Sequence, residues 1–299
     1  MNQQRAALAA IAVAIPLAMV ATLYTGTARH QEQAGSEHRL KIATSFYPLY
    51  DFTSHVAGDN AEIMTLIPPG VEPHDWEPTA GDISKARSAD ILIINGAGFE
   101  KWSEGIGAKR IVNTSEGIEM RGINDDDPHI WLDPALAKVQ VENIKAALIE
   151  ADPKNADQYS ENAAAYAREL DGLDAYIKAG LANCKKSDFI AFHDAFGRFA
   201  ARYGLTQHAI EGISPEGEVL PQRIEQVIGL ARQLGIKVIY SEDLVDSRLA
   251  DVIAGELSGR VLVLSPVEGI SKTEQAAGIG YIDKMKENVL HLKESLQCQ

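Results

Sequence analysis

Short runs of apolar, often β-branched residues alternate along the chain with segments in which apolar residues recur every three or four positions. The first pattern predicts strands at 40–44, 61–66, 91–94 and 110–112, followed later by strands at 189–192, 207–210, 237–240 and 261–264. The second pattern predicts helices near 48–56, 79–86, 134–149, 195–203, 221–234 and 246–257. Strands that alternate with helices are typical of parallel sheets covered by helices. We therefore predict an α/β fold with two lobes, each a four-stranded parallel sheet flanked by helices.

A long polar stretch with a single apolar face lies between the two sets of strands. Its apolar residues recur at helical spacing and would share one helix face: Tyr159, Tyr166, Leu170, Leu173, Ile177 and Leu181. A helix from 155 to 181 would be about 40 Å long, so we expect one long, rigid helix to join the lobes. The predicted boundaries are 37–150 for the first lobe, 151–183 for the linker helix and 184–299 for the second lobe.

The amino-terminal residues have the composition of a secretory signal. Arg5 precedes an apolar stretch over 6–23, and small residues follow at 26–28. We expect residues 1–28 to be a signal peptide and the protein to be exported to the periplasm. The apolar stretch is long enough to serve as an uncleaved anchor instead. No cysteine lies near the expected cleavage point, so we expect no lipid anchor.

Charge and cysteine content agree with export. The formal net charge is −14, and an acidic surface repels nucleic acid, so we expect no nucleic-acid partner. The two cysteines are Cys184 and Cys298. An oxidising compartment permits a disulfide between them, which we predict, although two free thiols would also be compatible with the sequence.

Three histidines occur where a predicted strand or loop passes into a helix. His74 and His129 lie in proline-rich loops, and His193 directly follows the apolar strand 189–192. Each of them alone could be a surface or helix-terminal residue. Ligands of parallel α/β sheets bind beyond the carboxyl ends of the strands. The shared location of all three histidines therefore predicts a metal site between the lobes, whereas we expect the other histidines to be structural or exposed.

The same segments resemble the metal-binding solute receptors of bacterial zinc and manganese ABC transporters. The resemblance covers the mature chain and rests on residues 44–51, 72–79, 95–96, 128–134, 152–156, 193–196, 213–216 and 241–242. It implies two α/β lobes joined by one rigid helix, a metal in the cleft between them, and a membrane ABC permease as partner.

The chain departs from this family pattern in two places. Zinc-specific members often carry a histidine-rich loop before the second ligand, whereas 114–127 contains no histidine. Many members supply a carboxylate after the last strand, where this chain has Ser265. The fourth metal ligand is therefore open between water and Glu242, which follows the strand 237–240. Glu242 could also serve behind the ligands or have only a structural role.

Three neutral imidazoles favour Zn²⁺, since Mn²⁺ prefers a carboxylate-rich shell. We predict a monomeric periplasmic receptor that captures Zn²⁺ through His74, His129 and His193, with Glu242 as the candidate fourth ligand. It would deliver the ion to an ABC permease and would not be an enzyme. A manganese or iron receptor, a three-histidine zinc hydrolase or lyase, and an adhesin are the alternatives. The hydrolase would need a positioned acid or base, and the sequence offers only carboxylates without an assigned position.

Overall fold

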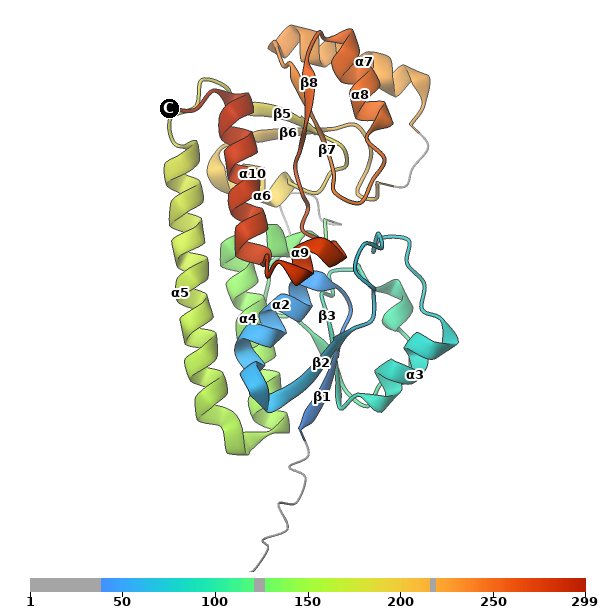
Figure 1. Ribbon diagram of the computed structural model, residues 1–299, viewed down its shortest axis with the longest axis vertical. Coiled ribbons are helices and arrows are strands. Elements are labelled where there is room, and N and C mark those ends of the chain that lie inside the picture. The colour runs from blue at the N-terminus through green and yellow to red at the C-terminus, as the bar shows by residue number, and fades with distance from the viewer. Residues whose placement is uncertain (1–38, 121–126, 216–218) are drawn as a thin grey trace, which may run out of the picture. The chain divides into compact units, whose positions relative to one another are not determined.

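Two four-stranded parallel sheets form the framework of the protein (Figure 1). The computed structural model describes residues 39–120, 127–215 and 219–299, so the expected signal peptide, 1–28, lies outside the described residues. The first sheet has the order β2-β1-β3-β4, with β1 Leu40–Thr44, β2 Ala61–Thr65, β3 Ile91–Ile94 and β4 Ile111–Asn113. The second has the order β6-β5-β7-β8, with β5 Asp188–Ala191, β6 Thr206–Ala209, β7 Val238–Ser241 and β8 Arg260–Val263. The predicted α/β class is confirmed, with every pairing parallel.

The first lobe has three helices among the described residues, and a side chain caps the start of the second and of the third. These helices are α2 Tyr47–Ala57, α3 Ala80–Ser88 and α4 Pro134–Ala151. The Thr79 hydroxyl accepts a hydrogen bond from the Asp82 backbone N–H, and the Asp133 carboxylate accepts one from Ala135. Both caps agree with the sequence, because Thr and Asp are favoured at the position before a helix. Four short 3-10 turns complete this part of the chain: η1 Gly58–Asn60, η2 Lys101–Ser103, η3 Ile130–Leu132 and η4 Pro153–Asn155.

Helix α5, Ala156–Leu181, is the long connection that the apolar spacing predicts. It has 26 residues and is therefore about 39 Å long, and all six residues of the predicted apolar face are buried. Figure 1 shows α5 running alongside both lobes. The second lobe adds α6 Gly197–Tyr203, α7 Pro221–Leu234, α8 Arg248–Glu256, α9 Lys272–Ala276 and α10 Tyr281–Leu296. Among the described residues, we find no helix with the length and hydropathy that a membrane span requires.

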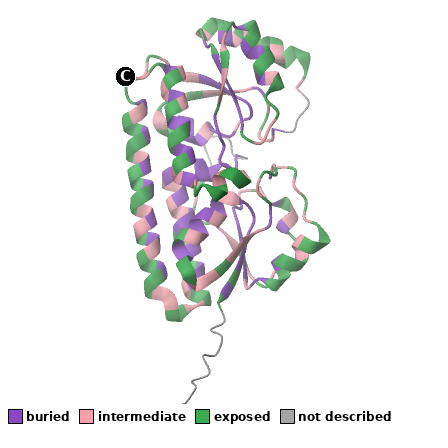
Figure 2. Cartoon of the chain, viewed as in Figure 1, coloured by how far each residue is buried: buried purple, intermediate pink, exposed green. Residues whose placement is uncertain are grey.

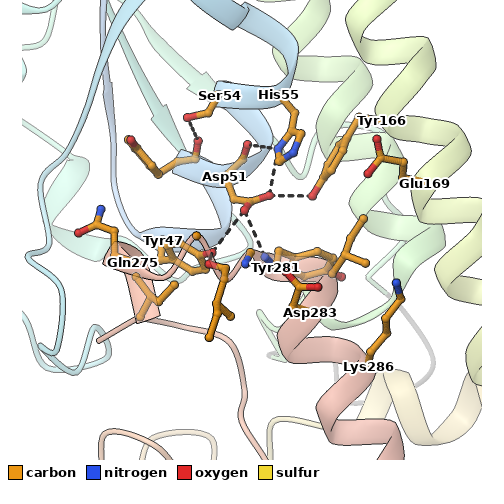
Figure 3. A pocket seen from close by; sticks show the side chains of 16 residues that line it. Tyr47, Asp51, Ser54, His55, Tyr166, Glu169, Gln275, Tyr281, Asp283 and Lys286 are labelled. Atoms are coloured by element: carbon orange, nitrogen blue, oxygen red, sulfur yellow. Dashed lines mark hydrogen bonds and ion pairs between the residues drawn. The ribbon is translucent and has the colours of Figure 1, made fainter. Parts of the chain in front are cut away.

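The buried carboxylate of Asp51 ties α2 to α5 and to the start of α10 (Figure 3). It accepts hydrogen bonds from the Tyr166 hydroxyl at 2.7 Å, the Tyr281 backbone N–H at 3.2 Å and the Tyr47 hydroxyl at 3.3 Å. Helix α10 also contacts the second lobe, for example where the Tyr240 hydroxyl donates to the His291 carbonyl. Two helices, α5 and α10, therefore bridge the lobes. The predicted bounds of the first lobe, the linker helix and the second lobe, 37–150, 151–183 and 184–299, therefore remain a proposal.

Buried residues are concentrated on the strands and on the faces of the helices that pack against them (Figure 2). The largest apolar cluster contains residues of both lobes together with the inner face of α5. Cys184, just after α5, forms a disulfide with Cys298, just after α10. This confirms the predicted pairing, and it fastens the carboxyl end of the chain to the end of the long helix.

Candidate metal centre

The three histidines singled out from the sequence lie together. His74 comes from the loop after β2, His129 from the segment after β4, and His193 from the end of β5. The Nε2 atom of His129 is 3.2 Å from the Nε2 atoms of both His74 and His193. All three rings reach this point from beyond the carboxyl ends of their strands, which is where ligands of parallel α/β sheets are expected.

Glu268 is the fourth member of this group, and it was not among the ligands predicted from the sequence. Its Oε1 atom lies 3.2 Å from Nε2 of His74, 3.2 Å from Nε2 of His129 and 3.6 Å from Nε2 of His193. The four side chains are between 0% and 8% exposed. Together they offer four donor atoms within 4.8 Å of one another.

Five of the six separations among these atoms fit a tetrahedral metal ion. Ligand atoms held about 2.0 to 2.1 Å from a central ion at tetrahedral angles are about 3.3 to 3.4 Å apart. The five separations given above, from 3.2 to 3.6 Å, lie around that value. Three neutral nitrogens and one carboxylate oxygen at this spacing form a donor set that zinc accepts.

Two further carboxylates hold the imidazole rings from behind. Oδ1 of Asp127 is 2.7 Å from Nδ1 of His129, and Oε1 of Glu242 is 2.6 Å from Nδ1 of His193. Each carboxylate also accepts a hydrogen bond from the backbone N–H of its histidine, at 2.9 and 3.1 Å. A carboxylate on Nδ1 fixes the ring and leaves Nε2 free as an acceptor for a metal. The imidazole ring thus separates Glu242 from the four converging donor atoms.

The charges in this group depend on one another. Burial alone would raise the pKa of Glu268, but His74 and the other two histidines outweigh it and hold that pKa well below its usual range. Burial opposes protonation of His129 and His193, yet the neighbouring carboxylates raise the pKa of both. Burial raises the pKa of Glu72 to about 8, and the negative charge of Glu268 adds to this. Without a cation, His129 and His193 therefore bind protons more readily than a free histidine does.

An unusual backbone turn directs Glu268 toward the histidines. The preceding residue, Val267, is buried and has a φ of 57°, a left-handed conformation that costs energy for a β-branched residue. The Ser265 hydroxyl accepts a hydrogen bond from the Val267 N–H at 3.1 Å. Asn288 of α10 bonds both backbone groups of Ser265, and the Pro266 carbonyl accepts a bond from the Trp131 ring at 2.8 Å. These contacts hold the turn in place.

Among the described residues, a cavity open to solvent reaches the site at His74. His74, the least buried of the four residues, lines a cavity of about 750 Å³ together with exposed Asp75 and Glu77 and the rings of Trp76 and Phe99. A hydrated cation entering there would meet His74 first. The negative charges at the rim would attract it.

The remaining histidines lie elsewhere, as the sequence suggested. His55 on α2 bonds the Asp51 carbonyl, His208 on β6 pairs with Asp188, and the His291 ring bonds the Val263 carbonyl. None of these three belongs to the group of four. His30 and His38 lie outside the described residues.

The missed residue, Glu268, had a signal in the sequence. The family pattern places a carboxylate after the last strand, and Ser265 occupies that place here. Three residues further along, Glu268 supplies the carboxylate. The left-handed turn at Val267 lies directly before Glu268.

Two α/β lobes, a long connecting helix and a buried metal-ligand cluster between the lobes define a helix-linked solute-binding protein. The chain belongs to the ZnuA family, described as the periplasmic component A of the zinc-uptake complex, whose profile matches residues 42–295. The resemblance drawn from the sequence is thereby confirmed.

Individual relatives agree with this assignment. The chain is 38% identical over 280 residues to the high-affinity zinc uptake system protein ZnuA of Bacillus subtilis, covering 86% of this chain and 88% of the relative. It is 30% identical over 312 residues to the zinc-binding protein AdcA of Streptococcus pyogenes, covering 94% of this chain but 61% of that longer protein. The Zn(II)-bound ZnuA-like domain of Streptococcus pneumoniae AdcA superposes with a TM-score of 0.78 at 33% identity, covering 86% of this chain and 99% of the domain.

The family is one of extracytoplasmic transport receptors and not of enzymes. This disfavours the hydrolase and lyase alternative. The family also places the protein outside the cytoplasm, as expected from the sequence.

Proposed function

We propose that this protein captures Zn²⁺ outside the cytoplasm and delivers it to a membrane ABC permease. The observation that carries the proposal is the set of four buried donor atoms at tetrahedral spacing. The printed functions of its relatives, zinc uptake and zinc binding, support the same conclusion. Zinc is here the transported cargo.

The proposed ligands are His74, His129, His193 and Glu268. Glu242 and Asp127 would hold the rings of His193 and His129 and would not contact the ion, because each bonds the Nδ1 atom on the far side of its ring. Such outer partners typically change metal affinity by about 10-fold to 100-fold when removed. Water is not required as a fourth ligand in this arrangement.

Zinc is favoured over manganese and iron for two reasons. Three of the four donors are imidazole nitrogens, and Mn²⁺ prefers more oxygen donors. The four donors also have tetrahedral spacing, whereas Mn²⁺ usually takes six ligands in octahedral geometry. We propose that manganese and iron bind more weakly.

We further propose that the receptor acts as a monomer in the periplasm after removal of residues 1–28, with an ABC permease as its membrane partner. The family description as a periplasmic component of an uptake complex supports the compartment and the partnership.

The test is a zinc titration of the exported protein after its metal has been removed, with a competing chelator. The His193→Ala variant should lose at least about 100-fold in affinity, because a missing ligand costs more than a missing outer partner. His208→Ala is the matched control, since His208 lies on the edge strand β6, pairs with Asp188 and is not part of the group of four. Equal affinities for the parent and His193→Ala would overturn the site. Manganese or iron retained in place of zinc by protein from its native compartment would overturn the choice of metal.

A further inference from the structure

Helix α6 begins four residues after His193 and sends two arginines back to the first lobe. Arg198 and Arg202 lie one helical turn apart, so their side chains are on the same face. Both reach the segment from Asp127 to Asp133, which contains His129. The helix that follows His193 therefore holds the segment that contains His129.

Arg198 makes the closer of the two contacts. It is 4% exposed, and its Nε and Nη2 atoms donate to the Asp127 carbonyl at 3.2 and 3.1 Å. Nη2 also donates to the Met120 carbonyl at 3.5 Å. The planar guanidinium thus serves two carbonyls at once, which the single ammonium of lysine does less well.

Arg198 also supplies a charge for the Asp127 carboxylate. Asp127 is 1% exposed, and its Oδ1 atom is fully engaged with the backbone and ring of His129. Its Oδ2 atom has no hydrogen-bond partner among the described residues but lies 3.6 Å from Nε of Arg198. A buried carboxylate is costly without a compensating charge, and the Arg198 guanidinium supplies that charge beside Asp127.

Arg202 fixes the other end of the same segment. Its Nε atom is 3.2 Å from Oδ1 of Asp133 and 2.9 Å from Oδ1 of Asp174. Asp133 caps α4 and Asp174 lies on α5. Arg202 therefore connects α6 with the start of α4 and with the long helix.

We propose that Arg198 is a positioning residue for zinc binding: through Asp127 it fixes the ring of His129 relative to His193, and Arg202 secures the same segment at Asp133. This inference rests on the proposed function. It explains how ligands from different lobes keep their spacing before the ion arrives. Neither arginine contacts the four donor atoms.

The test compares Arg198→Met with Arg198→Lys and with the control Arg248→Met. The Arg248 side chain is 88% exposed and bonds the nearby Asp246. Zinc affinity and dissociation rate are measured by chelator competition, and the absorption spectrum of bound Co²⁺ reports the ligand geometry. Thermal unfolding of the metal-free protein reports the fold.

Arg198→Met should bind zinc about 10-fold to 100-fold more weakly, as expected for the loss of an outer partner, with faster dissociation and an altered Co²⁺ spectrum. Arg198→Lys should show a smaller loss, and Arg248→Met should behave as the parent. A lower unfolding temperature with parental zinc affinity and Co²⁺ spectrum would mean a merely structural role and would overturn the proposal.

If Arg198→Met does not fold, the zinc affinity of Arg198→Lys tests the positioning role instead, because lysine keeps the charge but lacks the guanidinium geometry. Parental affinity in Arg198→Lys together with parental affinity in Arg202→Met would then overturn the proposal. Failure of the parent and Arg248→Met to bind zinc would refute the proposed function itself. Tight binding by the parent with no effect at Arg198 would refute only this inference.

Discussion

The roles of Glu268 and Glu242 can be separated by one pair of matched substitutions. Both are buried glutamates whose Oε1 atom faces a histidine ring, and Gln keeps the shape of each. Glu268 faces the Nε2 side, where the four donor atoms converge, whereas Glu242 faces Nδ1 of His193. Glu268→Gln should therefore remove a ligand charge, and Glu242→Gln only the support of a ligand.

The expected sizes follow from how a bound ion stabilises the native state. At a zinc concentration 100-fold above the dissociation constant, the parent gains about 2.7 kcal/mol. A variant about 100-fold weaker gains only about 0.4 kcal/mol at the same concentration, and one about 10-fold weaker gains about 1.4 kcal/mol. We assign the first value to Glu268→Gln and the second to Glu242→Gln.

The assay is thermal unfolding with and without zinc. For a domain of this size, 1 kcal/mol corresponds to about 2 to 4 °C. The zinc-dependent shift should therefore fall from about 5 to 11 °C in the parent to about 1 to 2 °C in Glu268→Gln, and to about 3 to 6 °C in Glu242→Gln. Each variant is compared with its own metal-free form, because both substitutions also alter the metal-free protein.

The opposite order would refute the reasoning. A shift abolished in Glu242→Gln and unchanged in Glu268→Gln would make Glu242 the ligand and Glu268 a bystander. Equal and complete loss in both variants would show that the imidazole ring does not separate Glu242 from the ion as the geometry requires.

Two further predictions concern pH and the disulfide. The pKa values of His129 and His193 are raised in the folded, metal-free protein, so the stability they contribute is full below about pH 6.5 and declines as the pH rises through the folded values. Zinc must displace those protons, so the affinity for zinc should rise with pH over the same range. Calorimetric titration in buffers of different ionisation enthalpy should show proton release on binding. A zinc affinity that does not change with pH would contradict this. The Cys184–Cys298 disulfide closes a loop with a sequence separation of 114, which corresponds to about 4 to 5 kcal/mol in the chain-entropy model. A double Cys→Ser variant should unfold at lower temperature and keep its zinc affinity, since Cys184 lies before β5 and His193 after it; an unchanged unfolding temperature would contradict the estimate.

Local patterns were sufficient to predict the strands and the three histidines. Each predicted strand agrees with an observed one to within one residue, because a short apolar run between turn residues has few alternative structures in a parallel sheet. The three histidines could be predicted for a similar reason. Parallel strands point their carboxyl ends in one direction, so residues that follow such strands are brought to one edge of the sheet.

The fourth ligand and the supporting charges depended on contacts that local patterns do not encode. Nothing in the sequence around Val267 indicates that a buried β-branched residue takes a left-handed conformation and redirects Glu268. Glu242 could be assigned to a strand end, but whether it meets a metal or Nδ1 of His193 depends on side-chain geometry. Arg198 and Asp127 are 71 positions apart, and only the folded chain places them together.

The connection between the lobes and the arrangement of the site depend on the same residues. Trp131, two positions after His129, donates to the carbonyl of Pro266, two positions before Glu268. The Trp131 carbonyl in turn accepts a hydrogen bond at 2.5 Å from Tyr281, whose backbone N–H is held by Asp51. The contacts that join α2 and α10 therefore extend to the segments that carry two of the proposed ligands. A lobe movement large enough to separate His129 from Glu268 would have to break this chain of buried hydrogen bonds, and buried polar groups that lose their partners are costly. The structure thus favours small adjustments around a preformed site over a wide opening of the two lobes.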